Sequence, residues 1–452
     1  MERAAGRPST SRILLSWKWH LTWQILPAAA IALGAFLLAR GLAERGHETP
    51  PSAMVDSQYE ARLAANIDFF STRVDETHDS LSYNRLVSLY LERLRLHGDV
   101  SDVRRAEIAA EKGLDAAPNA YANILAMAQV RLAQHDFEAV LSLVAKADTL
   151  KAAVPDSLAI RGDAEMALGR YREAGDDYRA YLDAAPEFSA FSREATYAEV
   201  NGNFDVAVQF WKAAIDSARE ESPVDAAWAR VQLGNLYATN GKVGAASDEY
   251  RTALDVFPGY ALAEAGLARV AVMRGDYGKA ADGYRAVTAK LPSAEFVAAY
   301  ADVAARAGRT AEATRQGELL AAIGQLYEAN GIRNDLTLIL FDLDHGKASA
   351  QTVAAARKAY EERPSLAAAD VYGWALYRDG QVDAARKLAD EAIGLGTREP
   401  LYLFHAGMIA KAQGDSAGSR EFLQRALEIN PSFHPVFASD AKQALKELGG
   451  AK

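Results

Sequence analysis

Apolar segments at helical spacing run along most of the chain and end at regularly spaced glycines. From Ser57 onward, each segment closes on a glycine, usually followed by a polar or small turn residue, with His135-Asp136 filling the one gap. The intervals between successive turns are 37, 34, 33, 39, 34, 33, 38, 34 and 34 residues. A fixed period of this length is the signature of a stacked helical repeat. The pattern therefore predicts about ten helix-turn-helix hairpins. The turn glycines are Gly98, Gly169, Gly202, Gly241, Gly275, Gly308, Gly346, Gly380 and Gly414.

Small residues recur at two fixed places around each turn. Seven residues before the turn stand Ala128, Gly162, Ala195, Gly234, Ala268, Ala301, Gly373 and Gly407. Five residues after it stand Ala174, Ala207, Ala246, Ala280, Ala313 and Ala385. Two helices approach closely only where a side chain is nearly absent, so these positions predict the contact inside each hairpin. Prolines at 118, 155, 186, 258, 292, 364 and 431 separate the hairpins, because proline stops a helix.

The unit around Gly241 shows the full pattern. Leu233-Gly234 and Tyr237 precede the turn, and Ala246, Tyr250, Ala253 and Pro258 follow it. This order resembles the tetratricopeptide repeat (TPR) of the bacterial type, and other units match it in part. The resemblance implies an all-α fold, a right-handed α-solenoid of TPR hairpins, in which the first helix of each hairpin lines a concave groove.

The residue directly after each small position is expected to point into that groove. These residues, with one aromatic neighbour, are the candidate partner-groove residues: Asp163, Thr196, Asn235, Arg269, Asp302, Trp374, Tyr377 and Met408. Trp374 with Tyr377, one turn later, is expected to form an aromatic anchor. Asp163 and Asp302 favour a basic or polar peptide as partner. The alternative for each residue is ordinary contact between helices or exposure to solvent.

Three insertions interrupt the period. They fall between Gly98 and Pro118, at residues 217–227, and at residues 322–335. The third is the least regular, and a break or bend in the superhelix is expected near residues 320–350. The segments Gln58–Val74 and Ser439–Leu448 are expected to act as end caps, since terminal repeats need a polar outer face.

The N-terminal region differs from the rest in charge and hydropathy. Residues 1–45 carry six basic and two acidic side chains, and the stretch Trp19–Ala39 is free of charge. About 20 apolar residues span a bilayer as a helix, and aromatic residues often lie at its edge. We therefore expect a transmembrane signal anchor over residues 19–40. A cleaved secretory signal and a buried helix of a cytoplasmic protein are the alternatives.

The basic residues before the span predict the orientation. Residues 1–18 are expected to be cytoplasmic, 41–56 to form a linker, and the repeats to lie outside the cytoplasm, in the periplasm or at the cell exterior. The repeats divide at the irregular region into an N-terminal part, 57–345, and a C-terminal part with its capping helix, 346–452.

Composition removes several classes of function. The chain has no cysteine, which excludes disulfides, thiolate metal sites and cysteine nucleophiles. Its net charge of -10 argues against nucleic acid as a partner. No phosphate-binding, dinucleotide or zinc-hydrolase motif occurs. Asp342, Asp344 and His345 could ligate a divalent cation, but these residue types are also ordinary at helix ends.

Together these observations favour a non-catalytic role without cofactor or metal. We expect a membrane-anchored TPR scaffold that holds a protein or peptide partner in its groove, in an assembly or adaptor role. One alternative is an accessory subunit of an export, polysaccharide or respiratory-complex assembly system. Another, of a different class, is a metal-dependent hydrolase that uses residues 320–350.

Overall fold

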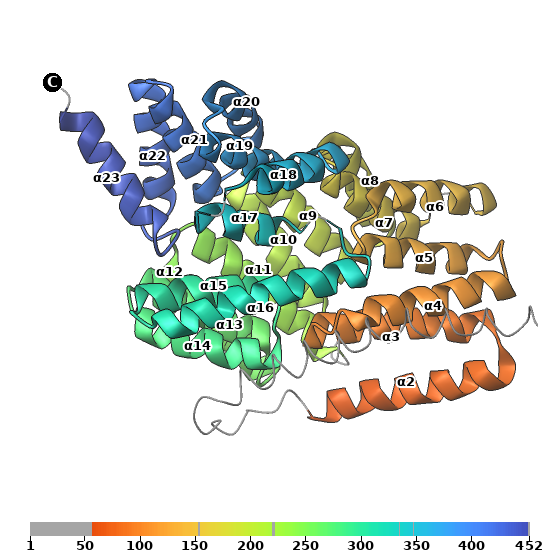
Figure 1. Cartoon of the computed structure of the whole chain (residues 1–452). Helices are drawn as coiled ribbons and strands as arrows, with labels where there is room; N and C mark the ends of the chain where they lie inside the picture. Colours follow the sequence, from red (N-terminus) through yellow and green to blue (C-terminus); the bar gives the residue numbers. More distant parts are fainter. Residues whose placement is uncertain (1–56, 152–153, 219–221, 334, 347, 451–452) are drawn as a thin grey trace, which may run out of the picture. The chain divides into compact units, whose positions relative to one another are not determined.

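A computed structural model describes residues 57–151, 154–218, 222–333, 335–346 and 348–450 (Figure 1). The predicted cytoplasmic tail, transmembrane helix and linker lie outside these residues. The described residues belong to one compact unit, which holds both predicted parts of the repeat array, 57–345 and 346–452. Within the described ranges, no helix combines the length and the apolar character needed to cross a membrane.

The described residues form 22 helices, and the all-α prediction is confirmed. Their bounds are α2 Ser57–Thr77, α3 Ser80–His97, α4 Ser101–Ala116, α5 Tyr121–Ala133, α6 Phe137–Leu150, α7 Pro155–Ala167, α8 Tyr171–Ala184, α9 Phe188–Val200, α10 Phe204–Ser217, α11 Pro223–Thr239, α12 Val243–Val256, α13 Ala261–Met273, α14 Tyr277–Lys290, α15 Ala294–Arg306, α16 Thr310–Ala329, α17 Leu336–Asp344, α18 Ala350–Glu362, α19 Leu366–Arg378, α20 Val382–Ala392, α21 Pro400–Ala412, α22 Ser416–Ile429 and α23 Phe437–Gly450.

Consecutive helices pair as ten hairpins, from α3 with α4 to α21 with α22. This number agrees with the prediction from the period. The first and last helices, α2 and α23, stand outside the pairs and pack against α3 and α22, close to the bounds expected for the two caps. The array is therefore an α-solenoid in which each hairpin packs mainly on its neighbours in sequence.

Each hairpin turn contains a residue in the left-handed region of the backbone. All nine predicted turn glycines have φ between 67° and 82°. Glycine takes this conformation without the steric cost of a Cβ atom. His135 has φ of 59° in the one turn without glycine. The chain therefore also turns at the one gap in the glycine pattern, as the spacing predicted.

The small residues form the contacts predicted inside the hairpins. A Cβ atom added to Gly162 would lie 2.6 Å from the ring of Tyr178, and one added to Gly234 would lie 2.6 Å from the ring of Tyr250. Both tyrosines are buried in the second helix of the same hairpin. The missing side chain is what lets a large aromatic ring pack flat against the first helix.

The insertions lengthen or shorten helices without stopping the array. Helix α11 has 17 residues, α16 has 20 and α17 only nine, whereas most others have 13 or 14. The short α17 still packs against α15, α18 and α19. Helix α17 does not pack against the preceding α16 in the way that other consecutive helices pack, and its packing on α18 is looser than in any other hairpin. The irregularity expected near residues 320–350 therefore appears as one loosened hairpin, while the contacts of α17 with α15 and α19 carry the array across it.

The superhelix is wound so tightly that its successive turns touch. Turns at the ends of first helices contact loops between hairpins much later in the chain. Three hydrogen bonds along this line join residues that are 198, 195 and 192 positions apart in the sequence. We call this line of contacts the seam. Figure 1 shows its effect: α18 lies beside α8, as the contact between Gly169 and Pro364 requires. The sequence period did not predict the seam.

Candidate partner-binding surface on the first helices

The small residue of each first helix faces its own hairpin partner, so the next residue is rotated by about 100° onto another face. We call the face of α7, α9, α11, α13 and α15 that carries these next residues the inner surface. Arg269 of this surface lies close enough to Glu399, which precedes α21, to lower its pKa. The charge of Arg269 on α13 therefore acts on a carboxylate at the start of α21.

In the hairpins of α7 and α9, the inner position holds an ion pair. Asp163 accepts two hydrogen bonds from the guanidinium of Arg193, at 2.8 and 2.6 Å, and one from the Tyr178 hydroxyl at 2.9 Å. A two-point pair of this kind fixes the relative position of two neighbouring first helices. Thr196, also predicted to face the groove, is exposed and bonds only to the Ser192 carbonyl of its own helix.

In the next two hairpins, the inner position is also polar and partly engaged. Asn235 accepts a hydrogen bond of 2.7 Å from the Tyr250 hydroxyl, and Arg269 donates one of 3.0 Å to Thr239. Asn235 and Arg269 are both half-buried. Part of their hydrogen-bonding capacity therefore holds the solenoid together, while their remaining surface faces solvent.

Asp302 on α15 joins two histidines. His345 Nε2 lies 3.0 Å and His434 Nε2 lies 3.7 Å from its carboxylate. His345 Nδ1 faces the Phe341 carbonyl at 2.8 Å, so both of its nitrogens need a proton, and the hydrogen bond to Asp302 raises its pKa. His434 Nδ1 accepts two backbone N–H groups, and burial lowers its pKa to about 4. Asp302 thus ties α17 and the segment before α23 to α15.

The aromatic anchor expected at Trp374 and Tyr377 is wrong. Trp374 is only 2% exposed, and its ring stacks on His405 with centroids 4.1 Å apart. Its Nε1 donates to Asp344 at 2.9 Å. Tyr377 stacks on Trp374, and Met408 packs against the same apolar cluster. The reason is that α17 and α23 cover this part of α19 and α21, so Trp374 belongs to the core, and Tyr377 and Met408 are half-buried against it.

Three carboxylates that the repeat pattern did not mark stand out electrostatically. Burial raises the pKa of Glu199 to about 7, against a hydrogen bond from Trp211, and the charge of Glu399 raises it further. Burial also raises the pKa of Glu295 and Glu399, and Arg269 lowers both. A raised pKa means that the carboxylate lacks full compensation for lost hydration. They lie near helix starts and ends, where the repeat pattern carries no signal for them.

The cluster proposed as a cation site does not converge. Asp344 accepts from Trp374, and burial raises its pKa to about 6, whereas His345 binds Asp302. Among the described residues, no three metal-ligating side chains are grouped so that they could hold a metal ion. Asp344 and His345 instead bond to different neighbours, Trp374 and Asp302.

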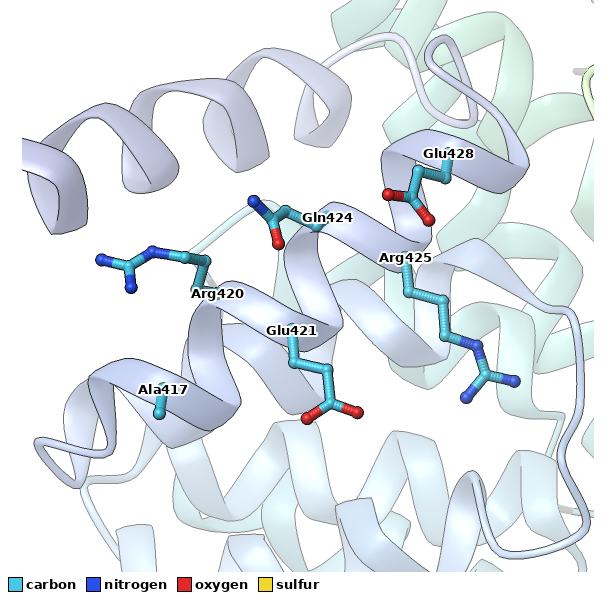
Figure 2. A pocket seen from close by; sticks show the side chains of 6 residues that line it. All are labelled: Ala417, Arg420, Glu421, Gln424, Arg425 and Glu428. Carbon is cyan, nitrogen blue, oxygen red and sulfur yellow. The ribbon is translucent and has the colours of Figure 1, made fainter.

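A hollow of about 430 Å³ lies on the surface of α22 (Figure 2). Its lining comes from a single helix: Ala417, Arg420, Glu421, Gln424, Arg425 and Glu428. Figure 2 shows the charged side chains pointing in different directions, and Arg420 donates to the Leu448 carbonyl at 2.9 Å. Charges of both signs on one exposed helix face are typical of a solvated surface.

Comparisons with known proteins agree with the repeat. Residues 231–295 and 372–432 match the tetratricopeptide repeat family, so the prediction of TPR repeats is confirmed there. These two stretches contain the unit around Gly241 and the units of α19 to α22. TPR repeats generally mediate protein–protein interaction as scaffolds, and the fold is generally non-catalytic.

Several solved structures are similar at low identity. The human IFIT1 dimer with PPP-AAAA has 15% identity and a TM-score of 0.45, over 82% of this chain and 87% of that one. The APC/C hetero-tetramer Cut9-Hcn1 has 12% identity and a TM-score of 0.32, over 87% of this chain and 94% of that one. YrrB, a TPR protein with an unusual peptide-binding site, has 18% identity and a TM-score of 0.29, over 42% of this chain and 95% of that one. No curated protein matches the chain.

Proposed function

We propose that this protein is a non-catalytic TPR scaffold that holds a protein or peptide partner on its inner surface. The observation that carries the proposal is the shortage of positive charge there. Glu295 on α15 is exposed and Glu399 is half-exposed, and Arg269 is a cation that lowers the pKa of each. A partner that brings lysine or arginine side chains supplies the missing compensation. This deepens the expectation of a basic or polar peptide.

Affinity capture with matched variants tests the role. The detergent-solubilised full-length chain is used as bait, and bound proteins are identified by mass spectrometry. A partner held on the inner surface is lost with Glu295→Gln and Glu399→Gln together. It is retained with Asp176→Asn and Asp248→Asn, whose side chains are exposed on outer helices. Since Glu295 is exposed and Glu399 is half-exposed, their replacement by amides of the same size is not expected to unfold the chain. Equal capture by both double variants contradicts the proposal.

We further propose that the residues before the solenoid anchor it to a bacterial-type membrane with the repeats outside the cytoplasm. The support is the charge-free stretch Trp19–Ala39 and the basic residues that precede it. An anchor confines the search for a partner to the membrane surface and so raises its effective concentration. Release of the full-length chain by carbonate, or access of protease to residues 60–452 only after the inner membrane is lysed, contradicts this part.

A further inference from the structure

The seam brings the two layers of the superhelix into backbone contact. A Cβ atom added to Gly169 would lie 2.1 Å from the Pro364 carbonyl oxygen, and one added to Gly202 would lie 2.3 Å from that of Gly396. One added to Gly241 would lie 2.7 Å from the Ile429 oxygen. Turns of the first layer therefore touch loops of the second layer with no side chain between them.

These contacts leave no passage for a polypeptide. An extended chain takes up about 5 Å between its neighbours in the direction of its hydrogen bonds. Contact continues from the turn at Gly98, which meets Leu291, to the turn at Gly241. A partner therefore cannot reach the inner surface of α7, α9 and α11 through the side of the superhelix while the seam is closed.

Between the turns at Gly169 and Gly241, the seam is held by polar bonds. Tyr171 accepts from the Leu366 N–H at 2.8 Å, Asn430 donates to the Ala238 carbonyl at 3.0 Å, and Arg398 donates to Asn240 at 2.6 Å. Each such bond adds little net stability, because water replaces it when it breaks. Large apolar side chains meet across this line near its start, where Tyr59 packs on Phe257.

We propose that the seam is a reversible clasp that controls entry of the partner to the inner surface. A solenoid whose hairpins pack mainly on their neighbours uncoils through small rotations shared by many hairpins, so the seam parts without loss of any hairpin. Closed, it admits partners at the ends of the superhelix alone. Open, it admits them from the side. The partner itself rests on the proposed function above, whereas the clasp does not.

The test compares two turn glycines that differ in one respect. Gly202 and Gly308 have nearly equal φ values of 71° and 75°, but no atom lies within 4 Å of a Cβ added at Gly308. Asparagine tolerates this backbone conformation better than other residues with a side chain. Gly202→Asn therefore forces the seam apart, and Gly308→Asn carries the same turn strain without touching it.

Access is measured by cysteine labelling, which needs no partner. The chain has no cysteine, so Thr196→Cys places one reactive thiol on the inner surface and Arg172→Cys places one on an outer helix. A small maleimide is expected to label both. A polyethylene glycol maleimide is expected to label position 172 readily and position 196 slowly. Gly202→Asn raises the slow rate by about fivefold or more, the change expected for each hydrogen bond lost, and Gly308→Asn leaves it unchanged.

Two results overturn the clasp. One is equal labelling of both positions by the large reagent in the parent chain, which shows an open inner surface. The other is an unchanged rate at position 196 in Gly202→Asn. If that variant does not fold, Tyr171→Phe with Arg398→Ala weakens the seam without altering a turn, and an unchanged rate there has the same meaning. Failure of affinity capture alone leaves these rates unaffected, so it counts against the proposed function and not against the clasp.

Discussion

The central hairpins, α7 to α14, and the C-terminal hairpins, α15 to α22, place side chains differently at the same position of the repeat. In the centre, Asp163 and Asn235 follow the small residue and each accepts a tyrosine hydroxyl from its own hairpin. At the C-terminal end, Trp374 and Met408 follow the small residue and pack into an apolar cluster. The difference comes from α17 and α23, which cover the C-terminal first helices. A repeat position therefore acquires its role from what packs across it.

The largest test of this comparison is Trp374→Ala. We expect it to lower the free energy of unfolding by about 3–5 kcal/mol, because a fully buried aromatic side chain leaves a cavity. Its central counterpart, Thr196→Ala, removes an exposed hydroxyl and is expected to change stability by less than about 0.5 kcal/mol. Urea denaturation of both variants measures the contrast. Similar small losses of stability in both variants would show that Trp374 is not buried.

A second contrast concerns the closeness of the two helices in a hairpin. Gly234→Ala forces the rigid ring of Tyr250 to move and is expected to cost about 1–3 kcal/mol. Gly407→Ala meets Leu423, whose side chain is fully buried but more flexible than a ring, so we expect a loss no larger than at Gly234. Gly317→Ala in α16 is the control, since no atom lies within 4 Å, and it is expected to gain about 0.5–1 kcal/mol. Thermal unfolding ranks the three, and a different order contradicts the packing described.

The two regions also differ in pH dependence. The pKa of Asp344 is raised from 3.8 to about 6, and that of Glu199 from 4.5 to about 7, burial being the largest cause of each shift. A carboxyl group with a raised folded-state pKa binds more protons in the folded chain than in the unfolded chain. Its contribution to stability therefore falls as the pH rises from the unfolded-state pKa to the folded-state pKa. Each accepts an indole N–H, which an amide oxygen can also accept.

Amide variants expose these windows. Asp344→Asn is expected to be more stable than the parent above about pH 6 and equal below about pH 4, and Glu199→Gln shows its gain above about pH 7. Melting temperatures from pH 3.5 to 8 measure both. A gain that does not vary with pH would show that the effect is not one of ionisation.

The last contrast concerns the tyrosine hydroxyls of the centre. Tyr250→Phe removes the hydrogen bond to Asn235 and is expected to cost about 1 kcal/mol. The C-terminal hairpin of α22 has Leu423 at this place, nine residues after the turn, and so has no such bond to lose. The free energy of unfolding is measured for Tyr250→Phe, for Asn235→Ala and for the double variant. The comparison separates the energy of the hydrogen bond from the effects of the two single changes. Additive losses would show that the two groups are not coupled.

Sequence reasoning located the hairpins better than the binding surface. The turn at His135 and both caps followed from the spacing alone, because they depend on contacts within one or two repeats. Trp374 was misplaced because its cover, α23, lies outside the repeat pattern. Glu295 and Glu399 were missed because the charge that acts on both, Arg269, comes from another hairpin.

The amino-acid sequence by itself determined the number of hairpins, their left-handed turns and their small contact positions, since each is decided by backbone sterics and close neighbours. The tertiary structure alone decided the seam and the exposure of the inner surface. Small rotations between successive hairpins add up over nearly two hundred residues, and three insertions alter the sum. Whether Gly202 meets Gly396 or open solvent depends on that accumulated rotation, which no local pattern records.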